Sequence, residues 1–143
     1  MRIKLEMPET YSFSTRMQLR ITDLNYGGHV GNDTFLALIQ EARQQFLLSH
    51  GYGELRFEGV GLIMTDAVIE FKRELNYGDE LEISVAATGL HSRGFDLYYT
   101  INIVNFYTPV VAAKAKTGML CYNYSTAKVV SVPEAAVKKI WGS

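Results

Sequence analysis

The chain has 143 residues, of which 48% are hydrophobic, and this is enough for one domain with its own apolar core. Its 14 Lys and Arg nearly balance its 15 Asp and Glu, which excludes a global positive field that would attract nucleic acid or anionic lipid. The single cysteine, Cys121, excludes an internal disulfide, and no Cys and His pairs stand at zinc spacing, so we expect neither a metal nor a cofactor.

The beginning of the chain shows no targeting segment. The residues up to Thr10 mix charged side chains and proline, without the apolar run of a signal peptide. Nowhere does the sequence approach the roughly 20 consecutive apolar residues that a membrane span needs. We therefore expect one domain over residues 1–143, in the cytoplasm.

The first predicted elements are a strand, a loop and a helix. Apolar and polar residues alternate from Phe13 to Ile21, which is the period of a half-buried strand. Three glycines then interrupt the pattern between Thr22 and Gly31, so this stretch is predicted to be a loop.

Helical spacing begins after this loop. Asn32 or Asp33 is predicted to cap the helix, and Gly51 to follow its end near His50. One apolar stripe repeats at helical spacing and is expected to be buried: Phe35, Leu38, Ile39, Ala42 and Phe46.

The rest of the chain is predicted to be mostly strands. Short connections rich in turn residues join four β-like segments, over Leu62–Lys72, Glu80–Leu90, Phe95–Phe106 and Val110–Tyr124. Near the C-terminus, Ser131 and Glu134 form a capping-box pattern with Pro133 between them, which predicts a short helix up to Trp141.

This order of elements predicts an α+β fold, in which a five-stranded antiparallel sheet packs against one long helix. Such a sheet has open edges, and a single helix leaves one of its faces uncovered. We therefore expect association of copies through an edge strand, as a homodimer or homotetramer.

The most informative stretch for function runs from Asp23 to Asn32 (DLNYGGHVGN), between the first strand and the helix that carries Glu41, Ala42 and Arg43. It resembles the Asp-x-Asp-x-x-Gly-His/Val-Val-x-Asn pattern of hot-dog-fold thioesterases of the 4-hydroxybenzoyl-CoA and YbgC-like type, whose helix carries Glu-x-Ala-Arg-like residues. The segment 69–79 (IEFKRELNYGD) also resembles that family, and the similarity extends over about residues 12–135.

The resemblance implies a hot-dog fold, in which the sheet wraps around the central helix, and an active site between subunits. It also implies the hydrolysis of a small acyl thioester of coenzyme A or of an acyl-carrier protein to a free acid and a thiol. Coenzyme A would then be part of the substrate and not a cofactor. Neither nucleic acid nor a membrane is expected as a partner.

The chain departs from the family at one position. The family's catalytic aspartate is the second of its Asp-x-Asp pair, where this chain has Asn25. A carboxamide cannot take a proton from water, although it can orient a water molecule or polarise the thioester oxygen. Proton transfer would then belong to Glu41, Asp23 or His29, with Glu41 as the first hypothesis. The plain alternatives are an exposed Glu41 that pairs with Gln45 or Arg43, and a His29 that only shapes the turn.

Further candidates concern substrate binding. Backbone N–H groups around Gly27 and from Gly28 to Val30 are predicted to hold the thioester oxygen, although the glycines could serve the turn alone. Tyr26 either lines the acyl pocket or is an exposed loop tyrosine. Coenzyme A needs cations for its phosphates, and the resemblance points to two pairs of residues: Lys72 and Arg73, and Ser92 and Arg93.

Two other functions stay open. Loss of the carboxylate at Asn25 suits a noncatalytic domain that binds or senses acyl thioesters, and a hot-dog enzyme that processes a carrier-bound polyketide would also suit the loop. Cys121 lies in an alternating strand and is predicted to be a core residue and not a nucleophile.

Overall fold

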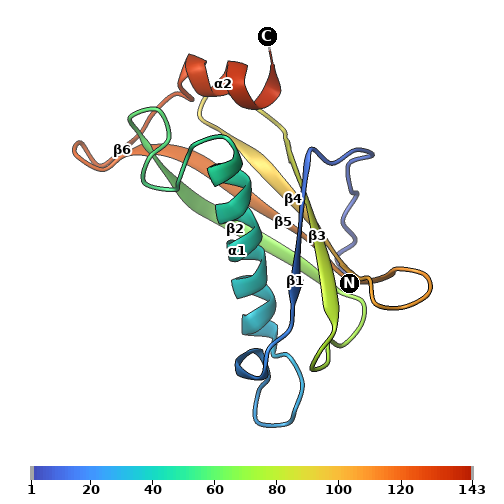
Figure 1. Cartoon of the computed structure of the whole chain (residues 1–143). Coiled ribbons are helices and arrows are strands. Elements are labelled where there is room, and N and C mark those ends of the chain that lie inside the picture. The colour runs from blue at the N-terminus through green and yellow to red at the C-terminus, as the bar shows by residue number, and fades with distance from the viewer. Residues whose placement is uncertain (1, 143) are drawn as a thin grey trace.

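The computed structural model describes residues 2–142, which form one curved sheet with a long helix across its inner face (Figure 1). The elements in chain order are β1 (Phe13–Gln18), the 3-10 helix η1 (Ile21–Asp23), α1 (Asn32–Ser49), β2 (Gly61–Phe71), β3 (Glu80–Thr88), β4 (Gly94–Ile103), β5 (Val110–Asn123), β6 (Lys128–Val129) and α2 (Glu134–Trp141). The α+β architecture with one long helix is confirmed. No helix among residues 2–142 is long and apolar enough to cross a membrane.

The sheet has the order β1-β3-β4-β5-β2, and every neighbouring pair is antiparallel. The short strand β6, which the sequence did not predict, pairs with the end of β5. In β4, alternate residues are buried beneath α1, as predicted: Phe95, Leu97, Tyr99, Ile101 and Ile103. Strands β1 and β2 form the two edges, and the 11-residue β2 is the longer of them.

The first strand ends earlier than predicted. Residues 21–23 turn into η1 instead of continuing β1, and Ile21 is consequently 69% exposed. The carboxylate of Asp23 explains this turn, because Asp23 Oδ2 accepts a hydrogen bond of 2.8 Å from the backbone N–H of Arg20. The polar loop therefore begins with a tight helical turn.

Helix α1 covers the sheet with the predicted stripe, and all five of its expected apolar residues are buried. The predicted cap is wrong, because Gly31 is the N-cap residue and no side chain caps the helix. The backbone N–H of Val30 bonds the oxygen of Leu75, and the chain stays extended up to Gly31. The helix therefore begins at Asn32, which is too late in the turn to be its cap. The end of the helix is as predicted, with Gly51 at a φ of +81°.

A buried polar network that the sequence did not predict fixes α1 to the sheet. Arg43 lies on the buried face of α1 and donates from Nε to Glu54 Oε1 at 2.5 Å and from Nη1 to the Tyr99 hydroxyl at 3.3 Å. The Tyr99 hydroxyl also bonds Thr117 Oγ1 at 2.7 Å. Burial raises the pKa of Tyr99, so its hydroxyl remains protonated. The network joins α1, β4, β5 and the loop after α1.

The C-terminal helix closes one end of the sheet (Figure 1). It ends at Trp141, as predicted, but Ser131 does not cap it. The backbone N–H of Val132 bonds the oxygen of Ser92, which holds this segment extended until Pro133, the N-cap residue. The indole of Trp141 donates to the oxygen of Ala87 at 3.0 Å and packs edge-on against Phe95.

Candidate active site

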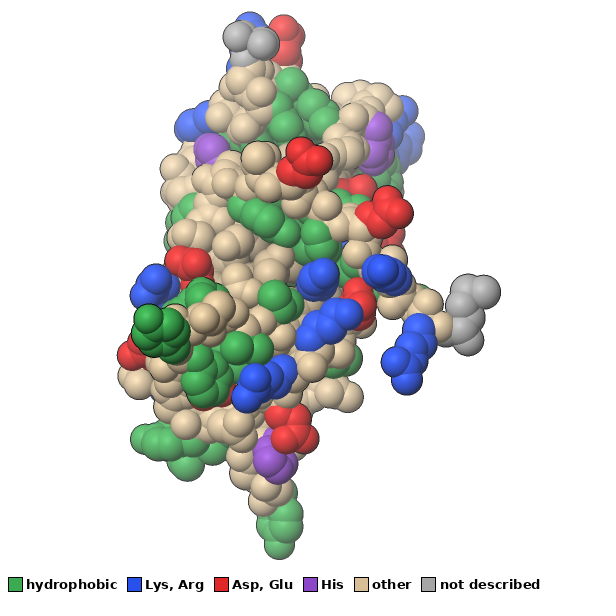
Figure 2. Space-filling model, turned by 90° about the vertical axis from the view of Figure 1, so that its right-hand side faces the viewer, with side chains coloured by type: hydrophobic (Ala, Val, Ile, Leu, Met, Phe, Trp, Pro, Cys, Tyr) green, Lys and Arg blue, Asp and Glu red, His purple; other side chains and the backbone are tan. Residues whose placement is uncertain are grey.

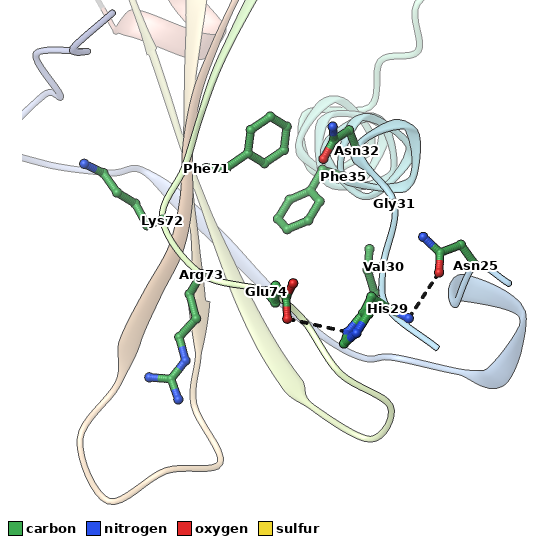
Figure 3. Close-up of a pocket in the computed structure, with 10 residues that line it drawn as sticks. All are labelled: Asn25, His29, Val30, Gly31, Asn32, Phe35, Phe71, Lys72, Arg73 and Glu74. Atoms are coloured by element: carbon green, nitrogen blue, oxygen red, sulfur yellow. Dashed lines mark hydrogen bonds and ion pairs between the residues drawn. The ribbon is translucent and has the colours of Figure 1, made fainter. Parts of the chain in front are cut away.

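A cavity of about 570 Å³ opens at the end of the sheet opposite α2. The loop after η1, the first turn of α1 and the connection from β2 to β3 supply its walls (Figure 3). Its lining residues are Asn25, His29, Val30, Gly31, Asn32, Phe35, Phe71, Lys72, Arg73 and Glu74. Five predicted site residues therefore lie in one cavity: Asn25, His29, Val30, Lys72 and Arg73.

Asn25 organises the polar loop. Its Oδ1 accepts hydrogen bonds from the backbone N–H of Gly27 at 2.9 Å and of His29 at 3.2 Å. Its own backbone N–H donates to the oxygen of His29 at 2.7 Å. The side-chain oxygen is thus used inside the loop, whereas the amide nitrogen points toward Gly31 and the cavity (Figure 3). Asn25 can present a hydrogen-bond donor there but no base.

His29 lies beside a carboxylate that the sequence analysis did not single out. Its Nδ1 is 3.5 Å from Glu74 Oε2, and the two side chains are 52% and 74% exposed (Figure 3). If Nδ1 carries the proton toward Glu74, Nε2 is free to accept one from a bound molecule. Glu74 is 45 residues away in the sequence, and only the contact between the polar loop and the β2–β3 connection reveals the pair.

The start of α1 offers further donors. The first N–H groups of a helix have no acceptor within the helix, and no side chain caps α1 at Gly31. Gly31 and Asn32 line the cavity, so the positive end of the helix dipole faces it. The expected donors from Gly28 to Val30 are instead bonded to Asn25 and Leu75. The free backbone donors nearest the cavity are therefore those at the start of α1.

One wall of the cavity is apolar and aromatic. The rings of Phe35 and Phe71 meet edge to face, with 5.1 Å between their centroids, and Phe71 is 47% exposed. Lys72 and Arg73 follow directly on the rim, where the Arg73 guanidinium lies 5.2 Å from the centroid of the Phe106 ring. An apolar group can therefore lie next to the polar loop, with cations nearby.

The structure places Glu41 and Asp23 elsewhere. Both line a different cavity of about 470 Å³, on the side of α1 that faces β1. Glu41 is exposed, and its Oε2 accepts a hydrogen bond of 2.7 Å from Gln45, which in turn bonds Thr15. Glu41 therefore pairs with Gln45 along the helix, and it does not share a cavity with Asn25 and His29.

Other predicted residues also lie outside the first cavity. Ser92 and Arg93 lie at the α2 end of the sheet, where Arg93 Nη1 donates to the oxygen of Val129. Tyr26 is fully exposed, and neither it nor Gly27 or Gly28 lines the cavity. Gly28 adopts a φ of +80°, at which the turn itself favours glycine.

Cys121 is fully buried, and burial raises its pKa to about 11, so the prediction that it is a core residue is confirmed. Among residues 2–142, no cluster of three His, Cys, Asp or Glu side chains is arranged to hold a metal ion.

Comparisons with known proteins agree with this architecture. The sequence profile of the Thioesterase-like superfamily matches residues 19–140. The 1,4-dihydroxy-2-naphthoyl-CoA hydrolase of Microcystis aeruginosa is 29% identical over 118 residues, which cover 80% of this chain and 83% of that protein.

Two solved structures show the same fold. A 1,4-dihydroxy-2-naphthoyl-CoA thioesterase from Synechocystis superposes with a TM-score of 0.80 at 22% identity, covering 90% of this chain and 95% of that one. An aspartate-to-asparagine mutant of 4-hydroxybenzoyl CoA thioesterase, complexed with 4-hydroxybenzoyl CoA, superposes with a TM-score of 0.82 at 13% identity, covering 92% and 99%. The predicted hot-dog fold is therefore confirmed.

Proposed function

This chain belongs to the Thioesterase-like superfamily, and from that premise we propose that it hydrolyses an acyl-CoA thioester to a free acid and a thiol. One observation carries the proposal: a single cavity joins the Asn25 amide, the His29–Glu74 pair and the uncapped start of α1. The similarity to a naphthoyl-CoA hydrolase supports an acyl-CoA substrate. The acyl group would lie against Phe35 and Phe71.

In the proposed mechanism, His29 is the general base. Water attacks the thioester carbonyl carbon while His29 Nε2 takes its proton, and the Glu74 carboxylate faces the positive charge that the imidazole gains. The carbonyl oxygen becomes an oxyanion, which accepts hydrogen bonds from Asn25 Nδ2 and from the first N–H groups of α1. When the intermediate collapses, the C–S bond breaks and the thiolate leaves with the proton from His29.

This assignment differs from the first hypothesis, in which Glu41 takes the proton. Glu41 lines another cavity than Asn25, whereas His29 and Asn25 share one and are joined by backbone hydrogen bonds. In this proposal Asn25 keeps its part as a polarising or orienting group, and the direction of its amide nitrogen, toward the cavity, supports this.

A panel of short, long and aromatic acyl-CoA thioesters tests the function through the release of free thiol. His29→Gln should lower kcat by about 10²- to 10⁴-fold, which is the usual contribution of general base catalysis. The matched variant Glu41→Gln should keep kcat within about twofold, because its side chain is exposed and apart from the cavity.

Two outcomes would contradict this proposal. A loss of turnover in Glu41→Gln but not in His29→Gln would return the proton transfer to Glu41. Tight binding of the thioesters without any thiol release by the wild type would favour the noncatalytic binding domain, which the missing carboxylate at residue 25 also suits.

We further propose a dimer in which the edge strand β2 pairs with β2 of a second copy. One side of this strand has no neighbour among the described residues, and Met64 and Phe71 on it are 49% and 47% exposed. Antiparallel pairing would bring the partner's α2 end, with its Ser92 and Arg93, beside this chain's cavity, which supports their expected part in phosphate binding.

Light scattering after size exclusion tests the dimer. Ala67→Glu places a charge on the exposed middle of β2 and should shift the protein from dimer to monomer, whereas Ala135→Glu on the exposed face of α2 should not. A wild type that is monomeric at micromolar concentration would contradict the proposed pairing.

A further inference from the structure

The residues before β1 lie on the face of the sheet that α1 does not cover. The backbone N–H of Leu5 donates to Glu70 Oε1 at 3.2 Å, and the Tyr11 hydroxyl bonds Thr100 Oγ1 at 2.7 Å. Glu70 and Thr100 alternate with Phe71 and Tyr99, whose side chains face α1, so both bonds hold the segment on the opposite face. This segment, residues 2–12, precedes the part that matches the superfamily, residues 19–140.

The segment and the end of β2 border a further cavity, of about 790 Å³, which we call the second cavity. It is distinct from the cavity that Glu41 lines. Its lining residues are Arg2, Ile3, Lys4, Ile69, Glu70, Phe71 and Lys72. Phe71 and Lys72 also line the first cavity, so the two hollows, which lie on opposite faces of the sheet, share the end of β2. An elongated ligand with its reactive group beside Asn25 would reach the second cavity by passing around this end.

The second cavity is cationic, although the whole chain carries a net charge of −1. Arg2, Lys4 and Lys72 line it, and Lys114 lies next to Glu70 across the β2–β5 pair. Glu70 is its one lining carboxylate among the described residues and is already bonded, to Lys72 Nζ at 2.5 Å and to the N–H of Leu5. Figure 2 shows several Lys and Arg side chains on one face, with acidic side chains between and beside them.

We infer that this second cavity binds the phosphate groups at the 3′-phosphoadenosine end of coenzyme A. The inference rests on the proposed function, since it takes the thioester to lie in the first cavity. Several phosphates close together suit a compact group of Lys and Arg side chains in a hollow. The acidic surface of a carrier protein would instead need cations spread over an open face. The site thus selects coenzyme A thioesters over carrier-bound ones.

The double variant Arg2→Gln, Lys4→Gln tests the site, with Arg16→Gln, Arg20→Gln as its matched control. The control removes the same charge from exposed positions in and just after β1, the edge of the sheet opposite β2. By calorimetry, the double variant should bind adenosine 3′,5′-bisphosphate roughly tenfold more weakly than wild type, and the control should bind it equally well. In steady-state kinetics, the double variant should raise KM for an acyl-CoA by a similar factor at unchanged kcat. It should leave KM for the phosphate-free acyl-pantetheine unchanged.

The outcomes separate this site from the proposed activity. Equal affinity of wild type and double variant for the bisphosphate would overturn the site, whether or not the protein hydrolyses thioesters. A KM that rises for an acyl-carrier protein and not for acyl-CoA would also overturn it, in favour of a carrier-docking surface. Weakened bisphosphate binding without any hydrolysis by the wild type would support the site and reject the thioesterase.

Discussion

The two ends of the sheet are built in opposite ways. At the α2 end, Phe95 is fully buried between Phe57 and Trp141, with ring centroids 5.9 Å and 5.0 Å away. At the other end, Phe71 has one aromatic neighbour, Phe35, and remains 47% exposed beside the polar cavity. The same strands therefore end in closed apolar packing on one side and in an open polar site on the other.

This difference separates stability from chemistry. Buried rings at the closed end contribute through packing and leave no room for a ligand. Exposed groups at the open end, such as His29 and Glu74, contribute little to folding and are free to contact a substrate. Substitutions at the two ends should consequently change different measurable quantities.

The largest effect on stability is expected from Phe95→Ala. Removing this fully buried ring should lower the free energy of unfolding by about 3–5 kcal/mol, because it leaves a cavity among Phe57, Trp141 and the sheet. Urea denaturation measures this change. The matched variant Phe71→Ala should cost only about 1 kcal/mol, since half of that ring is already exposed, but should raise KM for the acyl-CoA. Equal losses of stability in both variants would remove the contrast between the ends.

The next largest effect is expected on kcat, from Asn25→Asp, which tests whether residue 25 at the open end acts as a hydrogen-bond donor. The aspartate can still accept the N–H bonds of Gly27 and His29, so the stability should change by less than about 1 kcal/mol. It replaces the amide donor with a second carboxylate oxygen, and loss of one oxyanion donor should lower kcat by about 10²- to 10³-fold. Thiol release is the measurement. An increase in kcat would instead mean that residue 25 acts best as a base and that the natural Asn25 marks a weakened or noncatalytic site.

The local parts of the structure could be predicted from the sequence. The period of two in β4 and the stripe on α1 follow from neighbours a few residues apart, and both were found where predicted. The same helical period places Glu41 three residues from Leu38, at the edge of this stripe, and the structure agrees, because both residues line the cavity beside β1. A local period does not tell which loop or strand that edge of the helix faces.

The long-range parts could not be predicted. Glu74 meets His29 only because the polar loop packs on the β2–β3 connection, and Arg43 meets Tyr99 only because α1 crosses β4. The segment 2–12 has no periodic pattern, and its place on the sheet depends on single hydrogen bonds to Glu70 and Thr100. Such contacts join residues that no local pattern relates.

The smallest expected effect concerns one hydrogen bond at the closed end. Trp141→Phe keeps an aromatic ring beside Phe95 but removes the indole N–H that donates to the oxygen of Ala87. The loss should be about 1 kcal/mol in the free energy of unfolding, the usual net contribution of a single hydrogen bond. Thermal unfolding followed by circular dichroism measures it, and the kinetics of thiol release should not change, because the indole contacts Ala87 and Phe95, which do not line the cavity. A change in kcat with unchanged stability would show that the closed end takes part in the chemistry, and the division between the two ends would not hold.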